Sequence, residues 1–124
     1  MSVIVTDIGF GPDNWSAQDT VDLSPDIDPT RMVHNLHTIQ GIRIDFPSFA
    51  DGRGFTIARQ LRLMGFTGRL RACGHVLADQ YAMARRAGFD EVEIDDALAA
   101  RQPESQWLAR ADWQRHDYQS RLRG

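Results

Sequence analysis

The chain contains no lysine, so arginine supplies all 14 of its strongly basic residues. The absence of lysine excludes a phosphate-binding loop of the lysine-containing type, a Schiff-base nucleophile and a serine–lysine dyad. Arginine is therefore the strong cation left for anion recognition. Its planar guanidinium suits carboxylates, phosphates and sulfur oxyanions.

Cysteine is almost absent as well, because Cys73 is the only one. A single cysteine excludes an internal disulfide and a cysteine-clustered zinc site, and it argues against an iron–sulfur cluster held by this chain alone. His34 and His37 lie three residues apart, but no acidic residue follows them at a spacing suited to a metal site. We expect no metal site, and the sequence leaves any cofactor unknown.

Long apolar runs are also missing. No run approaches the roughly 20 residues that span a bilayer. Residues 1–7 lack the basic region and the apolar core of a signal peptide. We therefore expect a cytoplasmic protein that does not associate with membranes.

Positive charge is absent from the start of the chain. Residues 1–30 contain six aspartates and no arginine, while residues 31–124 contain 14 arginines and 11 acidic residues. The excess of three positive charges in the longer part is small, and no basic stripe alternates with aromatic residues. This distribution is not typical of nucleic-acid binding, so we expect no nucleic-acid partner.

The length of 124 residues suits one domain, which we divide into a capping segment (1–40), a core (41–95) and a helical tail (96–124). The capping segment is rich in turn residues and is expected to be irregular, with a possible short strand at 3–5 and a short helix at 30–39. The tail predicts a helix over 104–121, whose aromatic residues are typical of a core or an interface: Trp107, Trp113 and Tyr118.

The core has a regular pattern. Residues 42–46, 69–73 and 91–95 alternate between apolar and polar side chains, which predicts strands. Residues 54–64 and 77–87 carry apolar side chains at helical spacing, which predicts two helices between the strands. The core therefore predicts an α/β fold with a small parallel β-α-β-α-β sheet.

The two predicted helices end alike. Gly65-Phe66 and Gly88-Phe89 lie 23 residues apart, and each pair consists of a glycine cap followed by a phenylalanine that folds back on its helix. Parallel strands joined by helices are almost always right-handed crossovers. Both helices are therefore expected on the same face of the sheet.

The opposite face of the predicted sheet is charged. Either it is a solvated or half-covered face of an open, three-layer arrangement, or it is the polar concave side of a partial β/α barrel, where sites gather at the carboxyl ends of the strands. We expect the charged side chains to be sheltered by residues 1–40, by the tail or by a second subunit. The face carries Arg43, Asp45, Arg71, Cys73, Glu91, Glu93 and Asp95.

Residues 42–89 resemble a bacterial family of unknown function, numbered 934. The resemblance covers nearly half of the chain and departs from the family at His75, where relatives usually carry an aspartate. It is carried by Ile44-Asp45-Phe46-Pro47, Phe49, Asp51-Gly52-Arg53-Gly54-Phe55, Ala58-Arg59, Leu61-Arg62, Gly65-Phe66, Gly68, Leu70-Arg71-Ala72, Gly74, Val76-Leu77, Asp79-Gln80 and Gly88-Phe89-Asp90.

This resemblance implies a role in sulfur assimilation. Proteins of the family are typically encoded beside the assimilatory sulfite reductase hemoprotein, so the resemblance implies a role in sulfite reduction and a protein partner. Some members are labelled oxidoreductases without an assigned mechanism. Whether this chain is an enzyme is left open, and a homo-oligomer is equally compatible with the sequence.

The motif Asp51-Gly52-Arg53-Gly54 follows a predicted strand and opens a predicted helix. One interpretation is structural: the glycines form a turn and Asp51 caps the helix start. The other is functional: exposed amides around Gly52 and Gly54, together with Arg53, bind an anion at the carboxyl ends of the strands. Both interpretations are open.

Two further pairs of residues have alternative roles. Cys73 and His75 could form a thiolate–imidazole pair with a redox function, or Cys73 could be a small buried residue. Asp79 and Gln80 could line the mouth of a site beside Arg53, or they could be first-turn residues of a helix.

We interpret the chain as an accessory protein of sulfite reduction that delivers electrons with a partner or handles an oxyanion. Asp45, Asp51 and Asp79 are the candidate catalytic residues, and Gln80 joins residues 52–54 as a candidate ligand-binding group. One alternative is a noncatalytic subunit that docks on a reductase through its sheet face or its tryptophan-rich tail. The other is a stand-alone oxidoreductase or lyase that acts at the strand ends.

Overall fold

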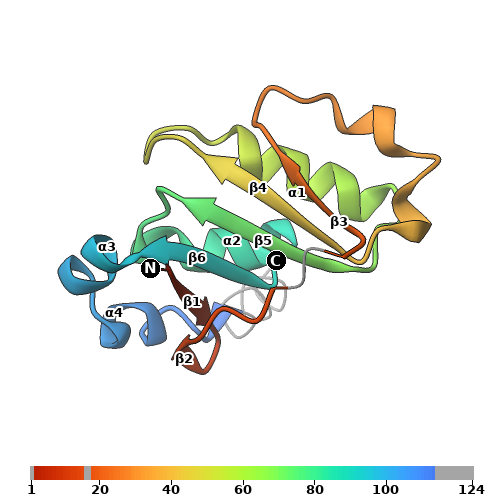
Figure 1. Cartoon of the computed structure of the whole chain (residues 1–124). Coiled ribbons are helices and arrows are strands. Elements are labelled where there is room, and N and C mark those ends of the chain that lie inside the picture. Colours follow the sequence, from red (N-terminus) through yellow and green to blue (C-terminus); the bar gives the residue numbers. More distant parts are fainter. Residues whose placement is uncertain (1, 16–17, 114–124) are drawn as a thin grey trace, which may run out of the picture.

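The computed structural model describes residues 2–15 and 18–113. In these residues the chain forms one sheet of six strands in the order β2-β1-β6-β5-β4-β3 (Figure 1). The strands are β1 (Ser2–Thr6), β2 (Gly9–Gly11), β3 (Thr20–Leu23), β4 (Gly41–Phe46), β5 (Arg69–Gly74) and β6 (Glu91–Asp95). The helices are α1 (Arg53–Leu63), α2 (Tyr81–Ala87), α3 (Asp96–Arg101) and α4 (Glu104–Leu108), and 3-10 turns form at η1 (Pro29–Met32), η2 (Leu36–Thr38) and η3 (Ala78–Gln80).

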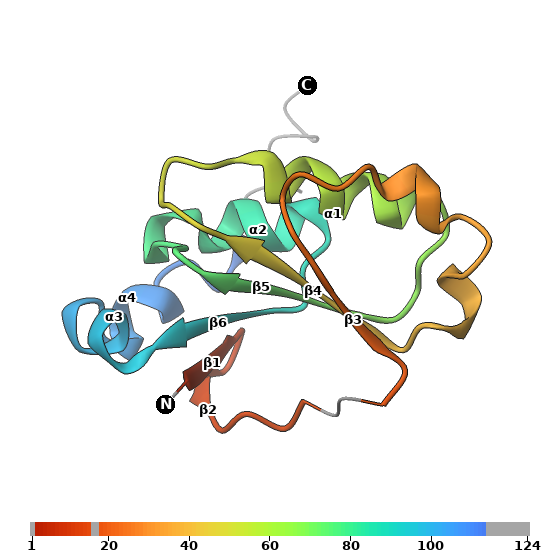
Figure 2. The same ribbon diagram turned by 45° about the horizontal axis from the view of Figure 1, so that its top comes forward.

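The three strands predicted for the core are parallel neighbours, as expected. In the register of β4, β5 and β6, Arg43 lies beside Arg71, and Cys73 lies beside Glu93. Helices α1 and α2 cover one face of the sheet, and the segment that follows β2 passes over the other (Figure 2). The α/β class and the parallel core are therefore confirmed.

The prediction of a purely parallel sheet is wrong, and the capping segment is more regular than predicted, although β1 confirms the short strand predicted at 3–5. Residues 1–40 supply three strands: β3 joins the parallel set beside β4, while β1 pairs antiparallel with both β6 and β2. Strands β2 and β3 are only three and four residues long, which is too short for alternation to be recognised. Because β2 and β3 end the strand order without pairing to each other, the sheet is open and does not close into a barrel.

Other predicted elements are shorter than expected. The helix predicted at 30–39 is two separate 3-10 turns, and α2 begins at Tyr81 after the turn η3. Of the helix predicted over 104–121, α4 ends at Leu108 and turns follow, Trp113 is helical again, and residues 114–121, including Tyr118, lie outside the described residues. Among the described residues, the helices all fall short of the length and apolarity needed to cross a membrane.

The two helix ends match, as the repeated motif predicts. Gly65 and Gly88 have φ values of +102° and +118°, and the buried Phe66 and Phe89 each donate their amide to a carbonyl five residues earlier in the helix. An arginine three residues before each glycine adds a bond that the motif does not reveal. Its guanidinium donates to the phenylalanine carbonyl, at 3.0 Å from Arg62 and 2.6 Å from the equivalent arginine of α2.

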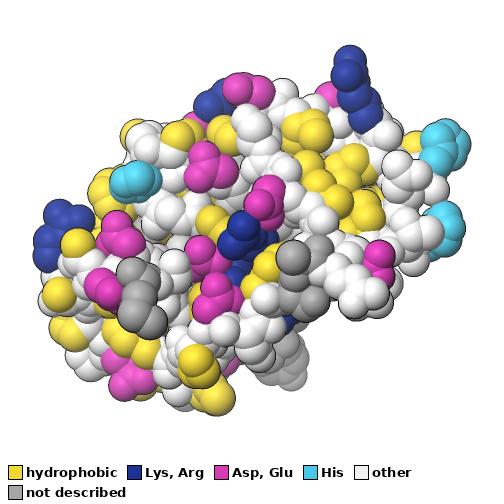
Figure 3. Space-filling model, viewed as in Figure 1, with side chains coloured by type: hydrophobic (Ala, Val, Ile, Leu, Met, Phe, Trp, Pro, Cys, Tyr) yellow, Lys and Arg dark blue, Asp and Glu magenta, His cyan; other side chains and the backbone are white. Residues whose placement is uncertain are grey.

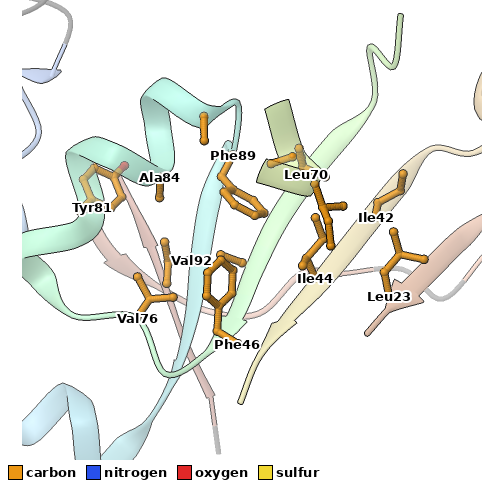
Figure 4. Close-up of a cluster of buried hydrophobic side chains, with 14 of the residues drawn as sticks. Leu23, Ile42, Ile44, Phe46, Leu70, Val76, Tyr81, Ala84, Phe89 and Val92 are labelled. Carbon is orange, nitrogen blue, oxygen red and sulfur yellow. The ribbon is translucent and has the colours of Figure 1, made fainter. Parts of the chain in front are cut away.

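The apolar side chains of the sheet meet these helices in one core (Figure 4). The Phe46 ring packs against the rings of Phe55 and Phe89 at centroid distances of 5.0 and 5.8 Å. Trp107 of α4 is buried and stacks edge-on against Tyr81 at 6.1 Å, which confirms it as a core residue. The labelled part of the core contains Leu23, Ile42, Ile44, Phe46, Leu70, Val76, Tyr81, Ala84, Phe89 and Val92.

Candidate functional site

The parallel strands β3 to β6 bring their carboxyl ends to one edge of the sheet, next to α3 (Figure 1). Ligands of open α/β sheets bind outside this edge. Two hollows lie there, and both are lined by Glu93. One, of about 170 Å³, is lined by His75, Asp95 and Arg101. The other, of about 190 Å³, is lined by Asp45 and Cys73.

His75 is positioned at the first hollow by the end of β5. Gly74 has a φ of +109°, and a Cβ there would come within 2.9 Å of the Phe46 carbonyl oxygen, so the turn requires glycine. The same oxygen accepts the His75 amide at 3.0 Å and lies 3.1 Å from Nδ1 of the ring. Because a carbonyl only accepts, this contact places the proton of a neutral ring on Nδ1 and leaves Nε2 as an acceptor.

The end of β6 and helix α3 supply the other charged groups of this hollow. Asp95 caps the helix by accepting the Leu98 amide at 2.8 Å. Arg101 lies in the last turn, is exposed, and forms no ion pair with any residue that the structure describes. The sequence had indicated Asp95 at a strand end, but it gave no signal for Arg101, whose place depends on how the short α3 packs.

The charged face of the sheet is a continuous network across four strands. Arg43 forms a two-point ion pair with Asp22 at 2.7 and 2.8 Å, and Arg71 donates to Glu91 at 2.6 Å and to Glu93 at 2.7 Å. Figure 3 shows this face, where basic side chains near the centre are bordered by acidic ones. The network joins opposite charges on neighbouring strands, which is the arrangement that stabilises cross-strand pairs.

Residues just before β3 cover this network. Asp13 accepts from Arg71 at 3.0 Å, and the Trp15 ring lies 4.6 Å from the Arg71 guanidinium and 5.2 Å from that of Arg69. Arg71 is 0% exposed as a result. The expectation that residues 1–40 shelter the charged face is therefore confirmed for Arg71 and in part for Arg43 and Glu93, whereas Asp45 and Asp95 at the strand ends are exposed.

The pairing is reflected in the pKa values. Burial opposes the charged form of Arg71, but its bonds to Asp13 and Glu93 outweigh burial and raise its pKa. Burial and the nearby Glu93 carboxylate raise the pKa of Cys73 far above its ordinary value. The Cys73 side chain is therefore a thiol at neutral pH.

Cys73 and His75 have different partners. The thiol lies 3.8 Å from Glu93 Oε1, whereas the histidine ring contacts the Phe46 carbonyl and packs edge-on against Phe49 at 5.0 Å. The two residues face different hollows, one on each side of Glu93. This geometry supports the interpretation of Cys73 as a partly buried thiol and not the thiolate–imidazole pair.

Arg53 is held by two carboxylates. Its guanidinium donates to Asp51 at 2.7 Å and to Asp26 at 2.5 Å, and these bonds, that with Asp51 foremost, raise the pKa of Arg53. Asp51 also accepts the Arg53 amide, a free amide at the start of α1, at 3.1 Å, but the N-cap position itself is Gly52. A Cβ on Gly54 would lie 2.4 Å from the Phe46 ring, so close packing explains this glycine. Neither strand-end hollow is lined by residues 51–54.

Asp79 and Gln80 contact residues other than Arg53. Asp79 is exposed and pairs with Arg110 at 3.0 Å. The Gln80 amide accepts from Leu77 N–H at 2.8 Å and donates to the Phe49 carbonyl at 3.2 Å, so it ties the loop after β4 to the start of η3. Among the described residues no cluster of His, Cys, Asp and Glu could hold a metal ion.

The chain was compared with known proteins. A family model described as "Bacterial protein of unknown function (DUF934)" matches residues 20–124, which includes β3 to β6 and leaves out β1, β2 and the covering Trp15. No curated protein and no solved structure matches the chain. Because the match covers most of the sequence, the chain belongs to the bacterial DUF934 family.

Proposed function

We propose that this chain is an accessory protein of assimilatory sulfite reduction that docks on the sulfite reductase hemoprotein without catalysing a reaction itself. The link to sulfite reduction rests on the family resemblance. One observation supports the noncatalytic role. The Cys73 thiol lies near Glu93, Arg71 pairs with Glu93 and Arg53 pairs with Asp51, so these groups are engaged within the fold.

The cysteine and the arginines of the sheet are poorly suited to catalysis. A cysteine attacks or ligates as a thiolate, and the raised pKa of Cys73 keeps it protonated. Arg43 and Arg71 each pair with carboxylates of the sheet, so their charge is neutralised within the fold. A stand-alone oxidoreductase or lyase would need such groups to be available to a substrate.

The surface best suited to docking is the outer face of α1 and α2. The sheet face is covered by Trp15, and Trp107 is buried, so neither this face nor Trp107 is open to a partner. Leu63 is 82% exposed and Met83 is 48% exposed, on helices that lie on the same side of the sheet (Figure 2). Arg59 on α1 forms no ion pair with a described residue. Exposed methionine and arginine are enriched at protein interfaces.

Complementation of a deletion strain tests this function. The strain is expected to grow poorly with sulfate or sulfite as the sulfur source and normally with sulfide. Cys73→Ala and Arg53→Ala should restore growth fully, because neither group takes part in chemistry. The double variant Leu63→Asp/Met83→Asp should not restore it, and the purified variant should no longer co-elute with the hemoprotein.

The controls separate docking from catalysis and from misfolding. Each variant should keep the circular dichroism and unfolding midpoint of the wild type, and Ile8→Asp, at a 91% exposed apolar position between β1 and β2, serves as a matched substitution away from the helices. A folded Cys73→Ala protein that fails to support growth contradicts the noncatalytic role. Growth of the deletion strain on sulfite contradicts the link to sulfite reduction.

A second candidate function is oxyanion handling at Arg53. The Asp26–Arg53 pair is open to solvent, with side-chain exposures of 77% and 55%, and exposed pairs are readily exchanged. An oxyanion could therefore replace Asp26 on the guanidinium. Calorimetry with sulfite and sulfate tests this: Arg53→Lys should weaken binding because the two-point contact is lost, and Arg53→Ala should weaken it further. Absence of binding to the wild type rejects this candidate.

A further inference from the structure

We propose that the hollow at the carboxyl ends of β5 and β6 binds a small α-amino acid through both of its charged groups. In this arrangement the ligand carboxylate meets Arg101 and the ligand ammonium meets Asp95. The inference stands apart from docking on the reductase, because it rests on a different surface of the molecule.

The size and place of the hollow suit such a ligand. Its volume of about 170 Å³ is below the roughly 300–1,000 Å³ of sites that hold cofactors or drug-sized molecules. It lies where the ends of β5 and β6 meet α3, at the edge where open α/β sheets bind ligands (Figure 1). Only a compact ligand fits this space.

The charges around the hollow have both signs. Arg101 forms no ion pair with the described residues, so its guanidinium can take a carboxylate in a two-point contact. Glu93 Oε1 is occupied by Arg71 and Arg43, and its Oε2 accepts the Ser2 hydroxyl at 3.3 Å. Asp95 uses Oδ1 to cap α3, and no bond of a described residue occupies its Oδ2, so it is the carboxylate available to a cation.

The two signs together select a zwitterion. A simple oxyanion would pair with Arg101 but would also face the carboxylates of Asp95 and Glu93. A simple amine would pair with Asp95 but would face the guanidinium. A ligand with an ammonium and a carboxylate on one carbon satisfies both groups at once.

The remaining lining residues define the side chain that the ligand should carry. Phe49 and Leu98 give the hollow an apolar wall. The proton on Nδ1 of His75 leaves Nε2 as an acceptor for a ligand N–H or S–H group. These contacts favour a short apolar or thiol side chain over a long or charged one.

Calorimetry with the full chain tests the ligand class by removing one charge at a time. L-alanine and L-cysteine are the probes, propionate and ethylamine are the matched molecules that lack the ammonium or the carboxylate, and sulfate is the inorganic anion. The amino acids should bind, and each molecule that lacks one charge should bind at least about tenfold more weakly, because one charge-assisted contact is lost.

Variants place the ligand in this hollow. Arg101→Gln and Asp95→Asn should each weaken binding of L-alanine by about tenfold or more. Asparagine keeps the acceptor that caps α3, so Asp95→Asn changes the charge and not the helix. Arg59→Gln removes an exposed arginine elsewhere and should leave binding unchanged.

Each other outcome overturns the inference. Propionate or sulfate binding as tightly as the amino acids would make this an anion site, and equal binding of ethylamine would make it an amine site. Unchanged affinity in Arg101→Gln would place the ligand elsewhere. The absence of heat with both amino acids would mean that the hollow binds neither.

Discussion

The two faces of the central strands use opposite chemistry, although both are formed by alternate residues of the same strands, β4, β5 and β6. On one face Ile42, Leu70 and Val92 are fully buried against α1 and α2. On the other, Arg71 is equally buried, but beneath Trp15 and among three carboxylates. The apolar face is stabilised by close packing alone. Each charged group on the other face needs a specific partner of opposite charge.

This difference has an energetic consequence. Burial of apolar side chains stabilises in proportion to the area removed from water. A buried ion pair contributes little net stability, but removing one partner leaves an uncompensated charge. The helix-covered face should therefore tolerate similar apolar replacements, and the charged face should respond most to a change that leaves a carboxylate alone.

The largest effect is expected on the apolar face. Phe89 is 0% exposed and packs against Phe46 and Phe55, so Phe89→Ala leaves a cavity between the sheet and the helices. The free energy of unfolding should fall by about 4 kcal/mol. Urea denaturation measures it, and Phe89→Leu should recover much of the loss. A loss no larger for Ala than for Leu would contradict the packing argument.

A slightly smaller loss is expected from the charged face. Arg71→Ala leaves Glu91 and Glu93 without their buried partner, so the free energy of unfolding should fall by about 3 kcal/mol. In Arg71→Met/Glu91→Gln the buried charges are reduced together, and much of the stability should return. If the double variant is as unstable as Arg71→Ala, charge imbalance is not the cause.

Removing the side chain that covers the charged face should lower the free energy of unfolding by a smaller amount. Trp15→Ala removes the ring that lies on the Arg71 and Arg69 guanidiniums and should lower the free energy of unfolding by about 1 kcal/mol. Trp15→Phe keeps a ring there and serves as the control. Equal losses in both variants would show that stacking on the guanidiniums is not what Trp15 contributes.

The charged face should also make stability depend on pH. The backbone N–H of Trp15 and the bond from Arg71 lower the pKa of Asp13 against the effect of burial, and the bond from Arg43 lowers the pKa of Asp22. A lowered folded-state pKa contributes stability that is present above the ordinary value of 3.8 and is lost as the pH falls through the folded-state value.

Unfolding between pH of about 5 and about 2.5 measures this contribution. Stability should fall over that range, and it should fall less steeply in Asp13→Asn/Asp22→Asn than in the wild type. Asp45→Asn is the matched control, because this exposed carboxylate has no ion pair among the described residues. Equal slopes in the wild type and the double variant would contradict the role of these pairs.

The smallest effect is expected outside both faces, at Arg53. Its side chain is 55% exposed and its pairs with Asp26 and Asp51 are at the surface. Arg53→Ala should leave the free energy of unfolding nearly unchanged, because exposed ion pairs contribute little. A thermal melt at low salt checks it, since screening is weakest there. A large loss would mean that the Asp26–Arg53 contact organises the segment between β3 and β4.

The sequence by itself determined the β4-α1-β5-α2-β6 core. Its signals are local: alternation along each strand, helical spacing between them, and a glycine–phenylalanine pair that ends each helix. These features depend on residues a few positions apart, and the structure confirms them. The expectation that the charged face is sheltered was also sound, because unpaired arginines and carboxylates are costly to bury.

Only the tertiary structure decided how the remaining residues are used. The bond from Arg71 to Asp13 joins residues 58 positions apart, and that from Arg53 to Asp26 joins residues 27 apart. The antiparallel pairing of β1 with β6 and the presence of Arg101 and His75 in one hollow likewise depend on contacts between distant segments. Local periodicity carries no information about such contacts, because they are selected by the packing of the whole chain and not by neighbours in sequence.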